Sequence, residues 1–193
     1  MYDKHFLATI FKSQLFTNEE QTTIISKFKR IEFSKNDFLL EEGKIENQYW
    51  FIESGFVRSF AVDLEGNDIS TNFYSVGELV IDWPSFFQRN PAKENIQALT
   101  DCICWELDFN TFQNLFHGIE AFREQGRSNL VASYFALKNH SVSLITDQAK
   151  DRYKKLLQEK PKVLQAISLK QIATYLGITD TSLSRIRKEL ANE

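Results

Sequence analysis

Four glycines recur at intervals of 11 or 12 residues in the first half of the chain. They are Gly43, Gly55, Gly66 and Gly77. Glycine tolerates the positive φ of tight turns. The segments between these glycines, such as 49–52, 56–62 and 69–74, are rich in aromatic and β-branched residues. Short strands separated by turns at this spacing are typical of an antiparallel sandwich or barrel.

The same pattern continues beyond the glycines. Two further strands are expected at 96–99 and 102–107, and residues 63–68 have the composition of a hairpin loop. We therefore predict an all-β roll over residues 1–115, with a helix before the strands and another after them.

Two of the expected helices are well marked. Thr17 is a suitable N-cap for a helix over 18–28, and Glu20 completes a capping box. A much longer helix is expected over 119–145, which contains no proline and a single glycine, Gly126.

The long helix has two apolar stripes. The first holds Phe122, Leu130, Tyr134, Leu137 and Leu144, and the second holds Val131, Phe135 and Val142. A helix that is apolar on two sides must pack on two surfaces. We expect the β-roll to cover one stripe and a second copy of the chain to cover the other in a two-fold dimer. The first stripe is the predicted dimer interface, and a monomer with a well-buried helix is the alternative.

Charge is unevenly distributed along the chain. Residues 1–149 hold 13 Lys and Arg against 21 Asp and Glu, a charge of −8, whereas residues 150–193 hold 10 against 5, a charge of +5. The total of −3 argues against nucleic acid as a partner. The basic segment argues for it, because basic residues neutralise phosphates and release counterions. A basic solvated face without a ligand is the alternative interpretation.

The basic segment contains two capped helices. Ser168 caps a helix over 169–176, Thr179 caps a second over 180–191, and Gly177 lies in the turn between them. The apolar residues able to face the helix junction are Ile172, Leu176, Ile178, Leu183 and Ile186. This pattern predicts a helix-turn-helix, whose second helix lies in the DNA major groove. A three-helix bundle that only packs is the alternative.

Polar residues on the outer side of these helices are the predicted DNA contacts. Arg185 is the best candidate for reading a base, because its planar fork pairs with guanine O6 and N7, and Thr181 suits a thymine methyl or a base edge. Asp180 suits both the helix N-terminus and cytosine N4. Ser168, Ser182, Arg187 and Lys188 are expected on phosphates. The complete predicted set is Ser168, Lys170, Thr179, Asp180, Thr181, Ser182, Ser184, Arg185, Arg187 and Lys188.

Several segments in both halves of the chain resemble segments of one protein family. They are residues 42–43, 49–58, 74–79 and 178–188. In this order, and with a long helix between them, they resemble the Crp/Fnr family of transcription regulators over nearly the whole chain. The resemblance implies an α+β protein with a jelly-roll, cyclic-nucleotide-binding-like sensor domain at 1–117, a dimerisation helix at 118–146 and a helix-turn-helix DNA-binding domain at 147–193.

The resemblance also implies partners. It implies a homodimer that reads a pseudo-palindromic site in double-stranded DNA, with RNA polymerase and a small-molecule effector as further partners. The effector is expected between the β-roll and the long helix, where it would shift the pose of the two long helices in the dimer. The predicted effector residues are Gly77, Glu78, Leu79, Trp83, Ser85, Asn129 and Ser133.

Cyclic AMP is not the expected effector. The family pocket combines a Gly-Glu pair with a later Arg-Ser/Thr-Ala motif, in which the glutamate holds a ribose hydroxyl and the arginine pairs with the cyclic phosphate. Gly77 and Glu78 are present, but residues 88–97 offer Arg89 and Lys93 without that motif. A buried phosphate without a fixed counter-charge is costly. Another ligand, or none, is therefore expected.

Metal and redox chemistry have little support in the sequence. Cys102 and Cys104 are too few for a zinc or iron–sulfur site and are expected in the core. The histidines His5, His117 and His140 are scattered. The cofactor is therefore unknown, with no metal or iron–sulfur cluster expected.

The other functional classes have less support in the sequence. No catalytic constellation is visible, so the chain is not expected to be an enzyme. No apolar run is long enough for a membrane span or a signal sequence, which predicts a cytoplasmic protein without a membrane partner. The alternative function is a ligand-sensing signalling module that acts through protein contacts. Such a module would need exposed apolar anchors on the last helix, whose outward residues are polar.

Overall fold

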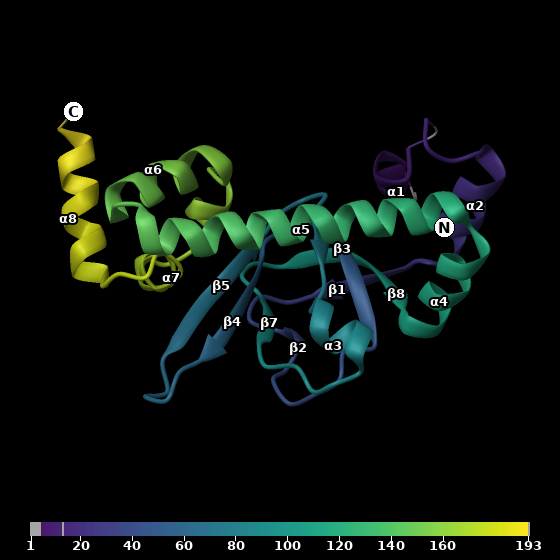
Figure 1. Ribbon diagram of the computed structural model, residues 1–193, viewed down its shortest axis with the longest axis horizontal. Helices are drawn as coiled ribbons and strands as arrows, with labels where there is room; N and C mark the ends of the chain where they lie inside the picture. Colours follow the sequence, from purple (N-terminus) through teal and green to yellow (C-terminus); the bar gives the residue numbers. More distant parts are fainter. Residues whose placement is uncertain (1–4, 13, 193) are drawn as a thin grey trace.

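The structure is a computed structural model that describes residues 5–12 and 14–192, with helices and strands arranged as in Figure 1. Within these residues, eight strands form two antiparallel sheets, which together make the β-roll. The first sheet has the order β1 (Lys29–Phe33), β8 (Cys102–Asp108), β3 (Gln48–Ser54) and β6 (Leu79–Val80). The second has the order β2 (Phe38–Leu40), β7 (Asn95–Ala98), β4 (Val57–Val62) and β5 (Asp68–Tyr74).

Helices lie before, within and after the β-roll. They are α1 (His5–Ile10), α2 (Asn18–Lys27), α3 (Trp83–Gln88), α4 (Phe109–Gly118), α5 (Glu120–Thr146), α6 (Ala149–Glu159), a short 3-10 turn at Val163–Gln165, α7 (Leu169–Tyr175) and α8 (Asp180–Ala191). The chain is therefore a mixed helix-and-sheet protein. Among the described residues, no helix is both long enough and apolar enough to cross a membrane.

The predicted strands and turns are confirmed. β3, β4, β5, β7 and β8 fall where the sequence pattern predicts them, and all four of the evenly spaced glycines have a positive φ. In the β4–β5 hairpin, the Asp63 carboxylate accepts hydrogen bonds from the backbone N–H groups of Glu65 and Asn67 at 2.9 and 2.8 Å, which fixes the loop. The short elements α1, β1, β2, β6 and α3 were not predicted.

The first sheet separates two apolar cores. Trp50, Cys102 and Cys104 are buried between the sheets, which confirms that the cysteines are core residues. Burial raises the pKa of the Cys104 thiol to about 12. On the other face of the sheet, side chains such as Tyr49 and Phe51 pack against α1, α2, α4 and the start of α5.

The long helix α5 departs from the sequence prediction. Phe122, assigned to the dimer stripe, is only 4% exposed and packs 6.0 Å from the ring centroids of both Phe11 and Phe112. The prediction that the β-roll covers the other stripe is wrong, because Val131, Phe135 and Val142 are 45%, 58% and 43% exposed. Both stripes are at least 40% exposed over Leu130, Val131, Tyr134, Phe135, Leu137, Val142 and Leu144. Helical periodicity identified the apolar residues, but only the tertiary structure shows that nothing in the described chain covers them.

The last three helices share a core that also includes residues of the β-roll. Leu156, Ala173 and Leu183 are buried together with Phe73 of β5 and with Leu99. The predicted caps are confirmed. Ser168 and Gln171 form the capping box of α7, and Thr179 Oγ1 accepts the backbone N–H of Ser182 at 3.2 Å.

Candidate functional site

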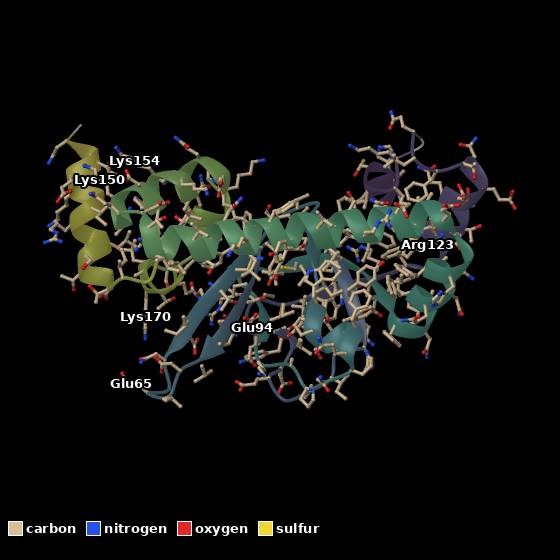
Figure 2. All side chains as sticks on the ribbon, in the orientation of Figure 1. Glu65, Glu94, Arg123, Lys150, Lys154 and Lys170 are labelled. Carbon is tan, nitrogen blue, oxygen red and sulfur yellow. The ribbon has the colours of Figure 1, made fainter. Side chains whose placement is uncertain are left out.

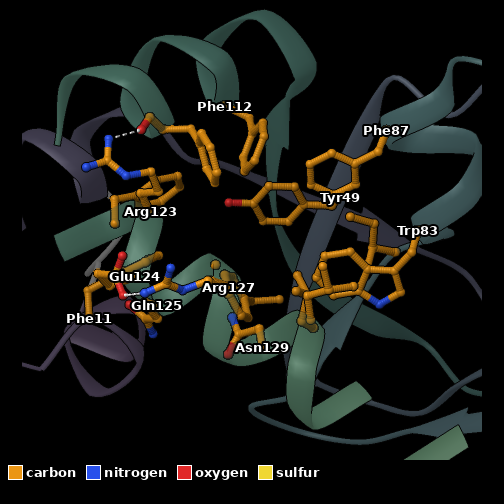
Figure 3. Close-up of a pocket in the computed structure, with 17 residues that line it drawn as sticks. Phe11, Tyr49, Trp83, Phe87, Phe112, Arg123, Glu124, Gln125, Arg127 and Asn129 are labelled. Carbon is orange, nitrogen blue, oxygen red and sulfur yellow. Dashed lines mark hydrogen bonds and ion pairs between the residues drawn. The ribbon is translucent and has the colours of Figure 1, made fainter. Parts of the chain in front are cut away.

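A cavity of about 340 Å³ lies between the outer face of the first sheet and the first half of α5 (Figure 3). Its walls are almost entirely aromatic and aliphatic. The apolar side chains come from the segment after α1, from the first sheet and the residue after β6, and from α3, α4 and α5. They are Phe11, Tyr49, Phe51, Leu79, Ile81, Trp83, Phe87, Phe112, Phe116, Phe122 and Leu130. A concave apolar site of this size with a few polar groups is typical of a small-molecule pocket.

The polar groups of the cavity come mainly from one turn of α5. Arg123 and Arg127 line it together with Gln125, whose buried side-chain oxygen has no hydrogen-bond partner among the described residues. Arg127 pairs with Glu124, whereas Arg123 reaches the Phe116 carbonyl only at 3.5 Å. The cavity therefore contains cationic and hydrogen-bonding groups that the chain itself does not fully use.

Three of the seven predicted effector residues line this cavity. They are Leu79, Trp83 and Asn129, whereas Gly77, Glu78, Ser85 and Ser133 do not. Ser85 has a structural role, because its hydroxyl accepts the Glu46 N–H at 2.9 Å and donates to the Asn90 carbonyl at 2.7 Å. Apart from Trp83, the aromatic residues of the wall were not predicted to line an effector site. Gly126 was a usable signal, because a glycine inside a helix costs about 1 kcal/mol relative to alanine.

Glu78 is held by the chain itself. Its carboxylate accepts hydrogen bonds from the backbone and the hydroxyl of Ser75. Its other oxygen lies 3.1 Å from Lys160 Nζ, at the end of α6. The glutamate that the family likeness assigns to a ribose hydroxyl therefore joins the β-roll to the C-terminal helices.

Residues 88–97 supply no unpaired, buried cation that could hold a buried phosphate. Arg89 donates to the Glu46 carbonyl at 2.6 Å and stacks 4.1 Å from the centre of the Phe109 ring. Lys93 is exposed. Burial raises the pKa of the Glu94 carboxyl in the same segment. These contacts agree with the expectation that a cyclic phosphate lacks a counter-charge here.

A buried acid lies next to this segment. Glu46 is 1% exposed, and burial is the main cause that raises the pKa of its carboxyl to about 9. One carboxyl oxygen accepts the Asp82 N–H at 2.8 Å, and the other has no partner among the described residues. Glu46 is therefore protonated at neutral pH in the folded protein.

We expect Glu46→Gln to stabilise the protein above about pH 5. The pKa of the Glu46 carboxyl is near its ordinary value of 4.5 in the unfolded chain and is raised to about 9 in the folded protein. Rising pH between these values therefore favours unfolding of the wild type, and the neutral amide removes this cost, about 3–5 kcal/mol at pH 8. Denaturant unfolding from pH 4 to 9 measures the difference, with the exposed Glu42→Gln as control. A difference between Glu46→Gln and wild type that does not change with pH would contradict this assignment.

The C-terminal residues predicted to contact DNA lie on one helical unit. Asp180, Thr181, Arg185, Arg187 and Lys188 are exposed on α8, and Ser182 and Ser184 are half-buried there. Thr179, Ser168 and Lys170 are also exposed. The Asp180 carboxylate accepts the Thr181 N–H at 2.8 Å, in agreement with its expected role at the helix N-terminus. Leu183 and Ile186 face the other way, into the shared core.

The C-terminal helices are docked on β5. Tyr175 packs 5.2 Å from the Phe73 ring on one side and stacks 4.3 Å from His140 of α5 on the other. The Ser70 N–H donates to Thr174 Oγ1 at 3.2 Å. These contacts tie α7 to both the β-roll and α5.

The start of α7 faces the β4–β5 hairpin. Ser168 and Lys170 line a small hollow with Asn67 and Asp68, and Figure 2 shows Lys170 on the side of α7 toward the hairpin that carries Glu65. Two of the predicted DNA-contacting positions are thus placed next to Asp68, which is paired with Arg58 at 2.9 Å. The outward face of α8 is free of this hairpin.

Comparison with known proteins identifies the fold. The family described as "Cyclic nucleotide-binding domain" matches residues 30–118. The fold is similar to that of FixK2 from Bradyrhizobium japonicum, with a TM-score of 0.75 and 16% identity over 86% of this chain and 85% of that one. It is also similar to a CooA variant from Carboxydothermus hydrogenoformans, with a TM-score of 0.71 and 19% identity over 100% of this chain and 86% of that one.

A curated relative matches part of the chain. It is a cAMP-dependent protein kinase regulatory subunit from Candida albicans, 29% identical over 106 residues, which are 55% of this chain. The chain spans about a fifth (21%) of the length of that protein. These comparisons establish a cyclic-nucleotide-binding type of β-roll and neighbours that resemble the chain over nearly its whole length.

Proposed function

We propose that this chain is a non-catalytic, DNA-binding transcription regulator of the Crp/Fnr type. The observation that carries the proposal is that α8 is amphipathic, with one buried apolar face and one exposed polar and basic face. Leu183 and Ile186 are buried, whereas Thr181, Arg185 and Lys188 point a polar and basic face outward. A capped helix that follows a tight turn and has such a face fits the recognition helix of a helix-turn-helix.

Arg185 is the proposed base reader. Its side chain is exposed and makes no hydrogen bond or ion pair with the other described residues, so its guanidinium can form a bidentate contact with guanine. Thr181 and Ser184 lie one turn or less before it and suit neighbouring base edges. Arg187 and Lys188 suit the phosphates on either side.

The proposed organisation has three parts. Residues 1–117 form the sensor domain, 118–146 the dimerisation helix and 147–193 the DNA-binding domain. The exposed apolar stripes of α5 support a dimer, because contiguous apolar surface of this kind marks an interaction site. A two-fold axis along α5 would bury it in both copies at once.

The docked position of α7 suggests how DNA binding is regulated. Ser168 and Lys170 face the β4–β5 hairpin across a hollow that also holds the Arg58–Asp68 ion pair, so the hairpin stands where phosphates would have to approach them. We propose that the docked arrangement is the weaker DNA-binding state. An effector in the cavity beside α5 would then shift the population toward a second arrangement.

Salt dependence of DNA binding tests this proposal. An electrophoretic shift with genomic fragments should show a specific complex whose affinity falls steeply with salt. Replacing both Arg187 and Lys188 by alanine should weaken binding to all sequences similarly and lower the slope of log K against log salt by about 1–2 per subunit. Lys44→Ala, which removes a charge from the β-roll, is the control. No salt-sensitive complex with any fragment would overturn the proposal and favour a signalling module.

A further inference from the structure

We propose that the cavity between the first sheet and α5 binds an aromatic carboxylic acid. Eight aromatic rings form most of its wall, and two of them, Trp83 and Phe87, are stacked with their planes 10° apart. Flat aromatic faces favour offset or edge contacts with another ring. The lining therefore selects a flat, aromatic body rather than a sugar or a peptide.

Arg123 is the proposed anchor for the carboxylate. Its guanidinium carries five N–H donors, but it makes only a 3.5 Å hydrogen bond to Phe116 and lies 4.0 Å from Glu120. Arg127 is already paired with Glu124 and so contributes less. An arginine with unused donors beside a dry aromatic wall favours a planar carboxylate, which it can hold with two parallel hydrogen bonds.

Tyr49 and Gln125 supply two further polar atoms. Figure 3 shows the Tyr49 hydroxyl pointing into the cavity between Phe112 and the arginines of α5. The buried oxygen of Gln125 lacks a donor among the described residues, although its amide nitrogen is held by the Ile10 carbonyl at 3.2 Å. Buried polar atoms are normally hydrogen-bonded. A ligand hydroxyl or ring N–H would satisfy the Gln125 oxygen.

Gly126 keeps the cavity open along the helix. A Cβ at this position would meet only the Phe116 ring, at 3.7 Å, so an alanine fits in ordinary contact. A longer side chain would extend into the space that the wall residues enclose. This position therefore offers a variant that fills the cavity while favouring the helix.

The cavity is distinct from the position that the family likeness assigns to a cyclic nucleotide. Glu78 is not part of its wall and is bonded to Ser75 and Lys160. This proposal rests on the proposed function in one respect, which is that the cavity is treated as an effector site. Ligand binding itself is measured without DNA.

Isothermal titration calorimetry of the full chain with 2-naphthoate, and with 2-naphthylmethanol as the uncharged match, tests the assignment. Wild type should bind one naphthoate per chain, at least about tenfold more tightly than the alcohol. Arg123→Gln should weaken naphthoate binding about tenfold to a hundredfold and leave alcohol binding unchanged, with partial rescue by Arg123→Lys. Gly126→Leu should remove both. Lys138→Gln, on the same helix outside the cavity, should behave as wild type.

Three outcomes would overturn the assignment. They are no saturable binding of naphthoate, equal affinity for acid and alcohol, and binding that persists in Gly126→Leu, which would place the ligand elsewhere. Circular dichroism confirms that each variant is folded. If DNA binding holds while naphthoate fails, the ligand class is wrong and the proposed function stands. If naphthoate binds as expected while DNA binding fails, the site stands without the proposed function.

Discussion

Leu137→Asp is expected to convert a dimer of this protein into a monomer. Leu137 lies near the centre of the exposed apolar surface of α5 and is 66% exposed in the single chain. In the proposed two-fold dimer, the introduced carboxylate would be buried against an apolar partner without a counter-charge, which costs several kcal/mol. Analytical ultracentrifugation measures the change in mass, and DNA affinity should fall with it because each half-site would be bound by one copy alone.

The matched control for this experiment lies one residue earlier on the same helix. Ala136→Asp introduces the same charge at an exposed position whose neighbours three and four residues away belong to neither apolar stripe. It should leave the dimer and DNA binding unchanged. Because Leu137 is exposed in the single chain, Leu137→Asp should have little effect on the unfolding temperature of an individual subunit. A Leu137→Asp protein that remains dimeric would show that α5 is not the interface.

Arg185→Ala is expected to lower the affinity for the specific site by about 1–3 kcal/mol, the typical cost of a lost bidentate base contact. The change should also relax the sequence preference at one base pair in each half-site. Fold stability should be unaffected, because Arg185 is exposed and makes no contact that holds α8 in place. Fluorescence anisotropy with the specific site and with single-base variants measures both effects.

Arg187→Ala serves as the comparison for Arg185→Ala. Both changes remove one positive charge from α8, but a phosphate contact carries no sequence information. Arg187→Ala should therefore weaken specific and non-specific binding alike. If Arg185→Ala also weakened every sequence by the same factor, Arg185 would be a phosphate contact and the proposed reading of α8 would be wrong.

Local features of the structure were predictable from sequence because their causes are local. The Ser168–Gln171 capping box needs residues three positions apart. The positive φ of Gly66 follows from the requirements of a hairpin turn. Both depend on neighbours along the chain, so the helices of the C-terminal segment and most strands of the β-roll could be placed without the structure.

The cavity and the docking of the C-terminal helices could not be predicted in the same way. Tyr49, Phe112 and Arg123 come from three different elements, and only the packing of those elements brings them together. Lys160 pairs with Glu78, which lies 82 residues earlier in the chain. A periodic pattern also cannot show what covers an apolar stripe. This explains why Phe122 was assigned to the dimer interface and why the second stripe was expected against the β-roll.

Selection of genomic DNA fragments by the purified protein tests the central claim most directly. The protein is mixed with sheared genomic DNA at near-physiological salt, and the retained fragments are sequenced. We predict enrichment of a pseudo-palindromic motif whose two half-sites are centred about one helical turn apart, or a multiple of it, as expected for two copies of α8 related by a two-fold axis. Retained fragments without a shared motif, or no retention above background, would contradict it.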